Sequence, residues 1–289
     1  MSCKSIIVIV SLFLFIFSCK KKEELLVDGN TAPPDYTIPT IVKENYINKS
    51  YISLLGRKPT SLELSSGQSI LNKNNLSIDN RNELLDSIFA KPGYYERVYI
   101  SNINKLLNNV DTSQITQNIA TFAFLLTDAS YQAVWPQIQI EKAKLEVLKT
   151  STNDLKNGTI NTIGLHKRIV NNYIYDQINM GTENFVHSIF QNFCFRYPTG
   201  IELAQSKLMV DGFQGVLFLQ IGMSKNDFLT IFFSSNNYYE GQVRDLFLKY
   251  LFREPTSVEA ATFSLNYKNS MDYKALQKSI LVMDEYVGL

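Results

Sequence analysis

Three stretches of the sequence repeat one pattern without gaps: YISLLGRKPTSLE at 51–63, FQNFCFRYPTGIE at 190–202 and FLKYLFREPTSVE at 247–259. Each stretch begins with an aromatic residue, and Arg-x-Pro-Thr-x-x-Glu starts six residues later. Chance is a poor explanation for three such matches in one chain. We therefore interpret them as three copies of one structural unit.

The fixed positions of the pattern predict a helix, a sharp corner and a second, capped helix. A proline disfavours helix in the residue before it, so the first helix should end near the Arg. Thr-x-x-Glu is the signature of a capping box, in which the Thr hydroxyl accepts a hydrogen bond from the Glu amide and the Glu carboxylate accepts one from the Thr amide. The predicted capping pairs are Thr60 with Glu63, Thr199 with Glu202, and Thr256 with Glu259.

Each copy continues into a second helical half. In the first two copies, two adjacent apolar residues are followed by two more one helical turn later, at 84–89 and 228–233. Tyr-Tyr-Glu follows at 94–96 and 238–240. The third copy keeps apolar residues at matching positions: Leu276, Ile280, Leu281 and Tyr286. This spacing places the apolar side chains along one stripe of a helix. We expect the stripe, with one tyrosine of each pair, to face the core.

Residues 111–184 separate the first two copies and differ from them. Apolar spacing predicts helices over 115–126, 138–149 and 160–178, with a break at Trp135-Pro136 between the first two. Glycines inside the second copy predict a loop there: Asp211-Gly212, Gly215 and Gly222. No stretch sustains the alternation of a β-strand. The sequence therefore predicts an all-α fold, a multi-helix body with three helix-corner-helix units.

The N-terminus has the features of a secreted, lipid-anchored protein. Lys4 precedes about a dozen apolar residues at 6–17, the length of a signal-peptide core and too short to span a bilayer. Ser18-Cys19 resembles the lipobox of bacterial lipoproteins, although Phe17 is bulkier than that pattern usually has. The resemblance implies cleavage before Cys19 and acyl chains such as palmitate on that cysteine. The alternative is an uncleaved N-terminal anchor helix.

Residues 20–42 contain charged residues, a glycine and three prolines, which predict a flexible tether. Lysines followed by acidic residues directly after Cys19 resemble the surface-export signals of Bacteroidota lipoproteins, which implies an outer-membrane or cell-surface location. The expected organisation is a signal peptide at 1–18, a lipidated cysteine and tether at 19–42, a first unit at 43–110, a central segment at 111–184, and the second and third units at 185–289. Once the signal peptide is removed, Cys194 is the only free thiol, so no intramolecular disulfide is expected.

The corner followed by an apolar stripe and Tyr-x-Glu resembles two groups of helical domains, over residues 43–98 and 185–289. One group occurs in planctomycete cytochrome-associated proteins, and the other forms short helical repeats of bacterial surface proteins with a Gly-Arg-x-Pro turn. Gly56 matches that turn, whereas the other copies have Phe195 and Phe252. Neither group has a settled activity. Because the chain has no haem-binding Cys-x-x-Cys-His, the resemblance implies a fold and no haem.

The composition excludes some classes of function. The 289 residues include 28 basic and 27 acidic side chains and 45% apolar residues. This balance argues against a nucleic-acid partner, and the apolar content is enough for a sizeable core. The chain has no Gly-x-Ser-x-Gly elbow, Walker loop or Gly-x-Gly-x-x-Gly motif. Cys194 stands where the other copies have Leu55 and Leu251, so we expect a packing role for it. We predict a protein that is not an enzyme, with no catalytic residue and no cofactor.

The remaining candidates for binding are few. Glu183 and His187 are spaced to share a helical face and His166 is the other histidine, so these three are weak metal candidates, although a helix-surface or core role is the simpler interpretation. Two further groups are weak ligand candidates: Arg57, Arg196 and Arg253, which suit carboxylate capture, and Tyr95 and Tyr239, which could stack on a glycan. The repeated positions of both groups favour pairing and packing within each unit.

These observations favour a non-catalytic lipoprotein, anchored in the membrane through lipid on Cys19, that acts as a scaffold or binding partner of envelope proteins. Exposed aromatic residues of the repeats are the expected anchors. The first alternative is a glycan- or peptide-binding lipoprotein of an uptake system. The second is a cryptic metal-dependent hydrolase.

Overall fold

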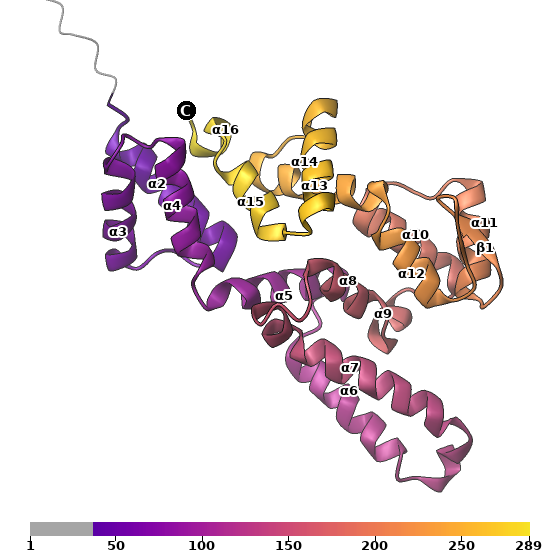
Figure 1. Cartoon of the computed structure of the whole chain (residues 1–289). Coiled ribbons are helices and arrows are strands. Elements are labelled where there is room, and N and C mark those ends of the chain that lie inside the picture. The colour runs from indigo at the N-terminus through magenta and orange to yellow at the C-terminus, as the bar shows by residue number, and fades with distance from the viewer. Residues whose placement is uncertain (1–36) are drawn as a thin grey trace, which may run out of the picture. The chain divides into compact units, whose positions relative to one another are not determined.

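The computed structural model describes residues 37–289. Ile38–Leu289 forms one compact unit with fifteen α-helices, a short 3-10 helix and a two-stranded β-hairpin (Figure 1). The predicted all-α fold class is confirmed. The predicted signal peptide, Cys19 and most of the predicted tether lie outside the described residues. Within 37–289, every helix is too short or too polar to cross a bilayer.

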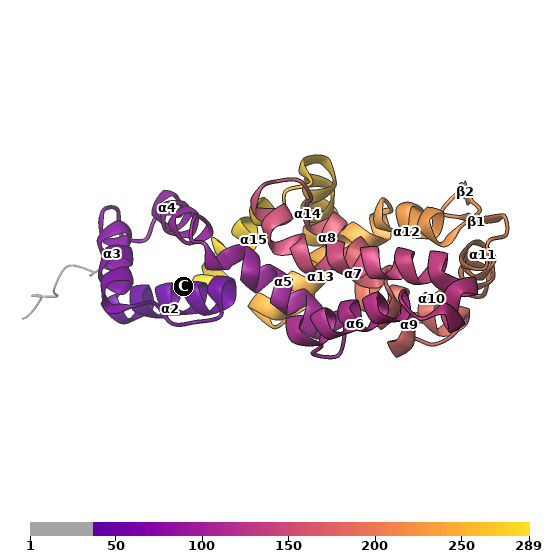
Figure 2. The same cartoon turned by 90° about the horizontal axis from the view of Figure 1, so that it is seen from below.

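The first copy contains α2 (Thr40–Leu55), α3 (Ser61–Asn72), α4 (Ile78–Phe89) and α5 (Gly93–Leu106). The tether was expected to reach residue 42, but α2 begins at Thr40. Its first turns already bury side chains against α3 and α4, which holds them in the helix. In Figure 2, α5 leads away from α2, α3 and α4 toward α6 and α8.

The second and third copies share one helix. The second copy has α10 (Thr182–Cys194), α11 (Gly200–Val210), α12 (Lys225–Phe233) and α13 (Asn236–Leu251). The third uses α13 as its first helix and continues through α14 (Ser257–Ser270), α15 (Tyr273–Leu281) and α16 (Asp284–Val287). The last helix packs on α2, where the Tyr286 and Tyr46 rings meet edge to face at 6.0 Å. The third copy is therefore joined to the first.

The central segment differs from its prediction in two places. It contains α6 (Thr112–Leu125), the 3-10 helix η1 (Ala129–Val134), α7 (Trp135–Lys156), α8 (Thr162–Val170) and α9 (Tyr173–Ile178). Trp135-Pro136 opens α7, because proline is tolerated in the first turn of a helix.

The single helix expected over 160–178 is two helices, α8 and α9. Asn172 separates them. Its side-chain nitrogen Nδ2 donates to the backbone carbonyls of Arg168 and Ile169. Its side-chain oxygen Oδ1 accepts from the backbone amides of Ile174 and Tyr175. One asparagine therefore closes α8 and caps α9.

The glycine-containing stretch of the second copy, expected as a loop, forms the antiparallel strands β1 (Gly215–Leu217) and β2 (Gln220–Gly222). The two glycines let the hairpin lie on α11. A Cβ on Gly215 would approach the Gln205 carbonyl oxygen to 2.3 Å, and one on Gly222 would approach Met209 Sδ to 2.6 Å. The sequence has no turn signal here, since Phe218-Leu219 occupies the turn.

The predicted apolar stripes form the core. The stripe residues of α4, α12 and α15 are buried: Leu84, Leu85, Ile88, Phe89, Phe228, Leu229, Phe232, Phe233, Leu276, Ile280 and Leu281. Of the first tyrosine pair, Tyr94 is buried and Tyr95 is half-buried, as expected. The expectation is wrong for the second pair, because Tyr238 and Tyr239 are both buried.

Candidate functional site

Each corner of the repeat is closed by a bidentate pair between its Arg and its Glu. In the second copy, Nη1 and Nη2 of Arg196 donate to the Glu202 carboxylate, both at 2.7 Å. The amide of Thr199 donates to this carboxylate at 2.7 Å, and the Thr199 hydroxyl accepts from the Glu202 amide at 3.2 Å. The same bonds join Arg57, Thr60 and Glu63, and Arg253, Thr256 and Glu259. All three predicted capping boxes are present.

The first aromatic residue of the pattern completes each corner. The guanidinium carbon lies 5.6, 5.0 and 5.1 Å from the ring centroids of Tyr51, Phe190 and Phe247, respectively. The Arg hydrogen bonds lower the pKa of the three glutamates, to about 2 for Glu259. Each Arg is thus engaged by its own unit, which favours the structural interpretation of the three arginines over a ligand role.

The residue before each corner Arg has a left-handed backbone. The φ angles are 71° at Gly56, 55° at Phe195 and 57° at Phe252. Gly adopts this conformation without steric cost, whereas a phenylalanine adopts it at a steric cost. The Gly-Arg-x-Pro turn of the first copy is therefore the unstrained form of a corner that the other two copies also make.

The tyrosine candidates do not form a stacking platform. Tyr239 is only 1% exposed, and its hydroxyl contacts Met271 Sδ at 3.2 Å. Its ring faces are therefore covered by protein. Tyr95 is half-buried, with the ammonium of Lys274 4.4 Å from its ring centroid.

The two histidines have different environments. His166 on α8 is buried, with Nδ1 2.9 Å from the Tyr238 hydroxyl and Nε2 2.8 Å from Asn102 Oδ1. Burial, with a smaller effect from the charge of Lys105, lowers the pKa of His166 to about 3. His187 instead packs its ring on Tyr197, at 5.3 Å between centroids.

The structure does not bring the metal candidates together. Glu183 forms an ion pair with Lys207 at 2.7 Å, while both nitrogens of His166 are engaged in the core. In the described part of the chain, no three His, Cys, Asp or Glu side chains are grouped to hold a metal ion. Cys194 is half-buried beside the core, and burial raises the pKa of its thiol to about 12.

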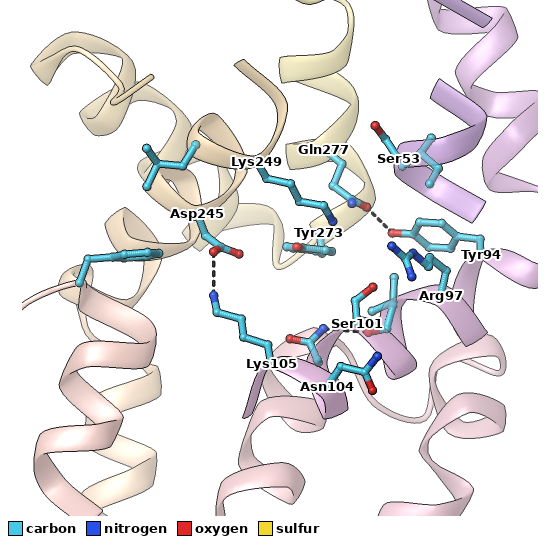
Figure 3. Close-up of a pocket in the computed structure, with 15 residues that line it drawn as sticks. Ser53, Tyr94, Arg97, Ser101, Asn104, Lys105, Asp245, Lys249, Tyr273 and Gln277 are labelled. Atoms are coloured by element: carbon cyan, nitrogen blue, oxygen red, sulfur yellow. Dashed lines mark hydrogen bonds and ion pairs between the residues drawn. The ribbon is translucent and has the colours of Figure 1, made fainter. Parts of the chain in front are cut away.

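A cavity of about 550 Å³ lies between α5 and α13, with α2 and α15 completing its wall (Figure 3). Three basic side chains line it: Arg97 and Lys105 from α5 and Lys249 from α13. Asp245 is the one acidic residue in the lining and pairs with Lys105 at 2.7 Å. Apolar groups, among them Leu54, also face the cavity.

Two of the cavity cations have no carboxylate partner among residues 37–289. Arg97 Nε is buried without a hydrogen bond, and Lys249 forms no ion pair in this part of the chain, although its ammonium lies 5.1 Å from the ring centroid of Tyr250. Crowding by protein lowers the pKa of Lys249; Asp245 opposes this effect, and Arg97 and Lys105 add to it by repulsion. The cavity therefore carries an excess of positive charge.

Sequence reasoning did not single out these residues. A signal was present, because the register that aligns Tyr94 with Tyr238 also aligns Lys105 with Lys249. Equivalent positions of equivalent helices thus contribute to one cavity. That two such helices face each other follows only from the tertiary structure.

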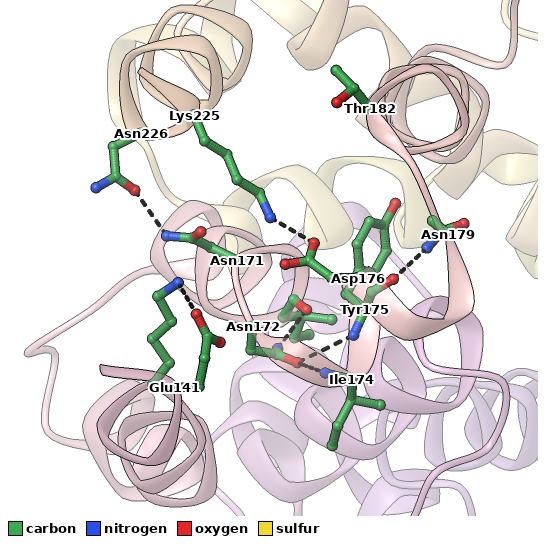
Figure 4. A network of polar contacts seen from close by, with 12 residues as sticks. Glu141, Asn171, Asn172, Ile174, Tyr175, Asp176, Asn179, Thr182, Lys225 and Asn226 are labelled. Carbon is green, nitrogen blue, oxygen red and sulfur yellow. Dashed lines mark hydrogen bonds and ion pairs between the residues drawn. The ribbon is translucent and has the colours of Figure 1, made fainter. Parts of the chain in front are cut away.

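A second polar cluster joins the central segment to the second copy (Figure 4). Lys225 on α12 contacts Asp176 on α9 at 2.5 Å, and the Asn171 amide donates to Asn226 at 2.8 Å. The Lys225 ammonium also lies 4.2 Å from the ring centroid of Phe185. These groups satisfy one another, so the cluster fits a structural role.

The β1–β2 hairpin exposes an apolar surface. Leu219 at its tip is 98% exposed and Ile221 is 66% exposed. Three more apolar side chains of this stretch are exposed: Phe213, Val216 and Met223. We refer to these five residues as the hairpin surface.

No known family model, curated protein or solved structure matches this chain.

Proposed function

We propose that this protein is a non-catalytic lipoprotein, held on the outer membrane or cell surface by lipid on Cys19, that binds a protein partner of the envelope through the hairpin surface. The hairpin surface is the observation that supports the proposal. Exposed apolar side chains gathered on one projecting element are typical of protein-contact sites, whereas scattered ones are ordinary. The predicted anchors were aromatic residues of the repeats, but this surface is mainly aliphatic.

The turn of the hairpin also supports a contact at its tip. Phe218 and Leu219 both have a left-handed backbone, with φ of 50° and 65°. Each such residue costs about 1–2 kcal/mol relative to glycine, and Asn-Gly would make the turn at little cost. Phe218 uses its ring in the core, within 6.3 Å of Phe190. Within residues 37–289 the side chain of Leu219 is left 98% exposed, which supports a contact with a partner at this position.

The charges beside the hairpin surface favour a protein over a membrane surface as its occupant. Lys207 on α11 and Lys225 on α12 are each paired with a carboxylate. Asp211, which follows α11, and Asp227 on α12 have no basic partner in 37–289. An anionic lipid surface attracts unpaired Lys and Arg, and both of these lysines are already paired. A protein with an apolar pocket and a basic rim is complementary to the hairpin surface.

The test is site-specific photo-crosslinking in intact cells of the full-length lipoprotein. A photoreactive amino acid replaces Leu219 in one strain and Leu62, an 80% exposed leucine on α3, in a control strain. We expect one protein adduct of defined mass from position 219 only. Ile221→Ser in the same chain should abolish that adduct, while Ile201→Ser, another exposed isoleucine, should not.

Other results would contradict the proposal. Adducts to lipid alone at position 219 would make the hairpin surface a membrane contact. Equal protein adducts from positions 219 and 62 would mean that the hairpin surface is not a specific site. Saturable glycan or peptide binding by the solubilised lipoprotein, with no adduct at 219, would instead favour the uptake alternative.

A further inference from the structure

We propose that the cavity between α5 and α13 binds a small organic dianion, with a phosphate or a pair of carboxylates at Arg97 and Lys249 and an apolar body against the opposite wall. This site is separate from the hairpin surface, and the inference does not depend on the function proposed above.

The charge of the cavity favours an anionic ligand. Arg97, Lys105 and Lys249 face Asp245, so two positive charges have no counter-charge in the lining. Like charges in a cavity with protein walls repel more strongly than in water, because the surrounding dielectric constant is lower. A bound dianion would neutralise the excess.

Packing holds the Arg97 side chain in place at the cavity. A Cβ on Gly56 would come within 3.0 Å of Arg97 Nε, so the Arg97 side chain packs directly on the glycine of the first corner. Its Nε is buried and has no hydrogen-bond partner among residues 37–289. Buried polar groups nearly always have partners, and an orphan calls for an explanation. In Figure 3 the guanidinium points into the cavity below Tyr94.

Arg97 has no counterpart in the second copy. In the register that pairs Tyr94 with Tyr238, Arg97 corresponds to Gly241 of α13. A Cβ on Gly241 would lie 1.7 Å from the Phe193 carbonyl oxygen, so the second copy packs its helices directly there. The first copy has an arginine at this point, which packs on Gly56 and lines the cavity. The arginine is therefore specific to the first copy.

Other polar groups of the lining are available to a ligand. The Tyr273 hydroxyl, the Ser101 hydroxyl and the Asn104 amide line the cavity and make no side-chain hydrogen bond within 37–289. Arg97 suits bidentate contact with planar or tetrahedral oxyanions, and Lys249 acts as a point charge. Apolar groups complete the wall: Leu54, Val98, Phe195 and Leu248. This mixture fits an organic anion better than a bare inorganic ion.

The experiment measures binding to the full-length lipoprotein in detergent micelles by isothermal titration and by the midpoint of thermal unfolding. The probes are inorganic phosphate and succinate, each compared with sodium chloride at equal ionic strength. We expect saturable binding of at least one dianion and a rise in the unfolding midpoint beyond that caused by chloride. The probe that binds more tightly identifies the head group as a phosphate or a pair of carboxylates.

Two variants locate the site. Lys249→Gln and Arg97→Gln should each weaken binding about tenfold or more, as expected for loss of a charged hydrogen-bond donor. Lys149→Gln removes the same charge from an exposed position on α7 and should leave binding unchanged. Without ligand, Lys249→Gln should not lower the unfolding midpoint, because it relieves repulsion.

Two outcomes would overturn the inference. One is that neither dianion has an effect beyond that of chloride. The other is that a dianion binds equally well to Lys249→Gln and to the unchanged chain, which would place the binding elsewhere. Should Arg97→Gln fail to fold, Lys249→Gln still decides between these results.

Discussion

Arg253 donates from Nη1 and Nη2 to the two carboxylate oxygens of Glu259, both at 2.8 Å. The same guanidinium binds Glu285 of α16 at 2.8–2.9 Å. The third corner therefore has an extra ion pair that ties the last helix to it. The first corner instead has a second ion pair between Lys91 and Glu63 at 3.0 Å, and in the second corner Arg196 also donates to Asn237 Oδ1 at 3.3 Å. The three copies thus share the Arg–Glu pair and differ in what is added to it.

The capping threonines should contribute equally to stability. Replacing Thr60, Thr199 or Thr256 by Ala removes the hydroxyl that accepts from the N3 amide, which costs about 1 kcal/mol, within roughly 0.5–2. Urea denaturation of the three variants measures the loss, and the serine variants, which keep a hydroxyl, are the control. If two of the three alanine variants unfolded at the same urea concentration as the unchanged chain, the capping interpretation would be wrong.

Replacing the two phenylalanines that have a left-handed backbone by glycine should change the free energy of unfolding differently. Phe252 is 86% exposed, so Phe252→Gly removes backbone strain and loses little packing. After allowing for the greater freedom of glycine in the unfolded chain, we expect a gain of roughly 0.5–1 kcal/mol in the free energy of unfolding. Arg244 and Lys105 lie 5.2 and 5.4 Å from the ring centroid of Phe195. Phe195→Gly should therefore gain less stability than Phe252→Gly, or lose stability.

Thermal and urea unfolding of both variants check this ordering. Gly56→Ala is the reverse test and should destabilise, because φ is 71° there and a Cβ would crowd Arg97. A Phe252→Gly variant less stable than the unchanged chain would show that the exposed ring has a role in the fold.

The anchor prediction rests on sequence alone, because Cys19 lies outside the described residues. Cys19→Ala should leave an unprocessed precursor without lipid label, since the cysteine thiol is the acylation site of a lipobox. Metabolic labelling with a fatty acid and the mass of the protein measure both effects, with Cys3→Ala as control. Two or more acyl chains hold a protein firmly in a membrane, whereas one does so only marginally. Labelling and processing that persist in Cys19→Ala would refute the prediction.

The sequence predicted the corners because their information is local. Thr-x-x-Glu, Pro and the aromatic residue lie within thirteen positions, and the structure uses each of them as expected. The sequence predicted neither the break at Asn172 nor the hairpin, for two different reasons. Asn172 ends one helix and caps the next inside a continuous apolar pattern, and Phe218-Leu219 makes a turn that normally requires glycine or asparagine.

The cavity could not be predicted from local patterns at all. Arg97 and Lys249 are far apart in sequence, and each looks like an ordinary helix residue. Only the packing of α5, α13 and their neighbours makes them face one space. The repeat register that aligns Lys105 with Lys249 shows that equivalent faces are involved, but it does not show that they meet.

His166 should make the stability of the fold sensitive to mild acid. Its folded pKa is about 3, lowered by burial, while an unfolded histidine titrates near 6.5. Between these values the unfolded chain binds a proton that the folded chain does not. The contribution of neutral His166 to the free energy of unfolding is therefore complete above about pH 6.5. It falls as the pH is lowered toward 3, by at most about 1.4 kcal/mol per pH unit.

The variant His166→Gln tests this directly, because an amide can still bond Tyr238 and Asn102 but does not titrate. Urea denaturation between pH 7 and pH 5, above the range where most carboxylates titrate, isolates the histidine effect. We expect the unchanged chain and His187→Gln to lose stability over this interval and His166→Gln to lose much less. Equal slopes for all three proteins would mean that His166 is protonated in the folded state. Nδ1 would then donate to the Tyr238 hydroxyl and Nε2 to Asn102 Oδ1, because both nitrogens of a protonated imidazole are donors.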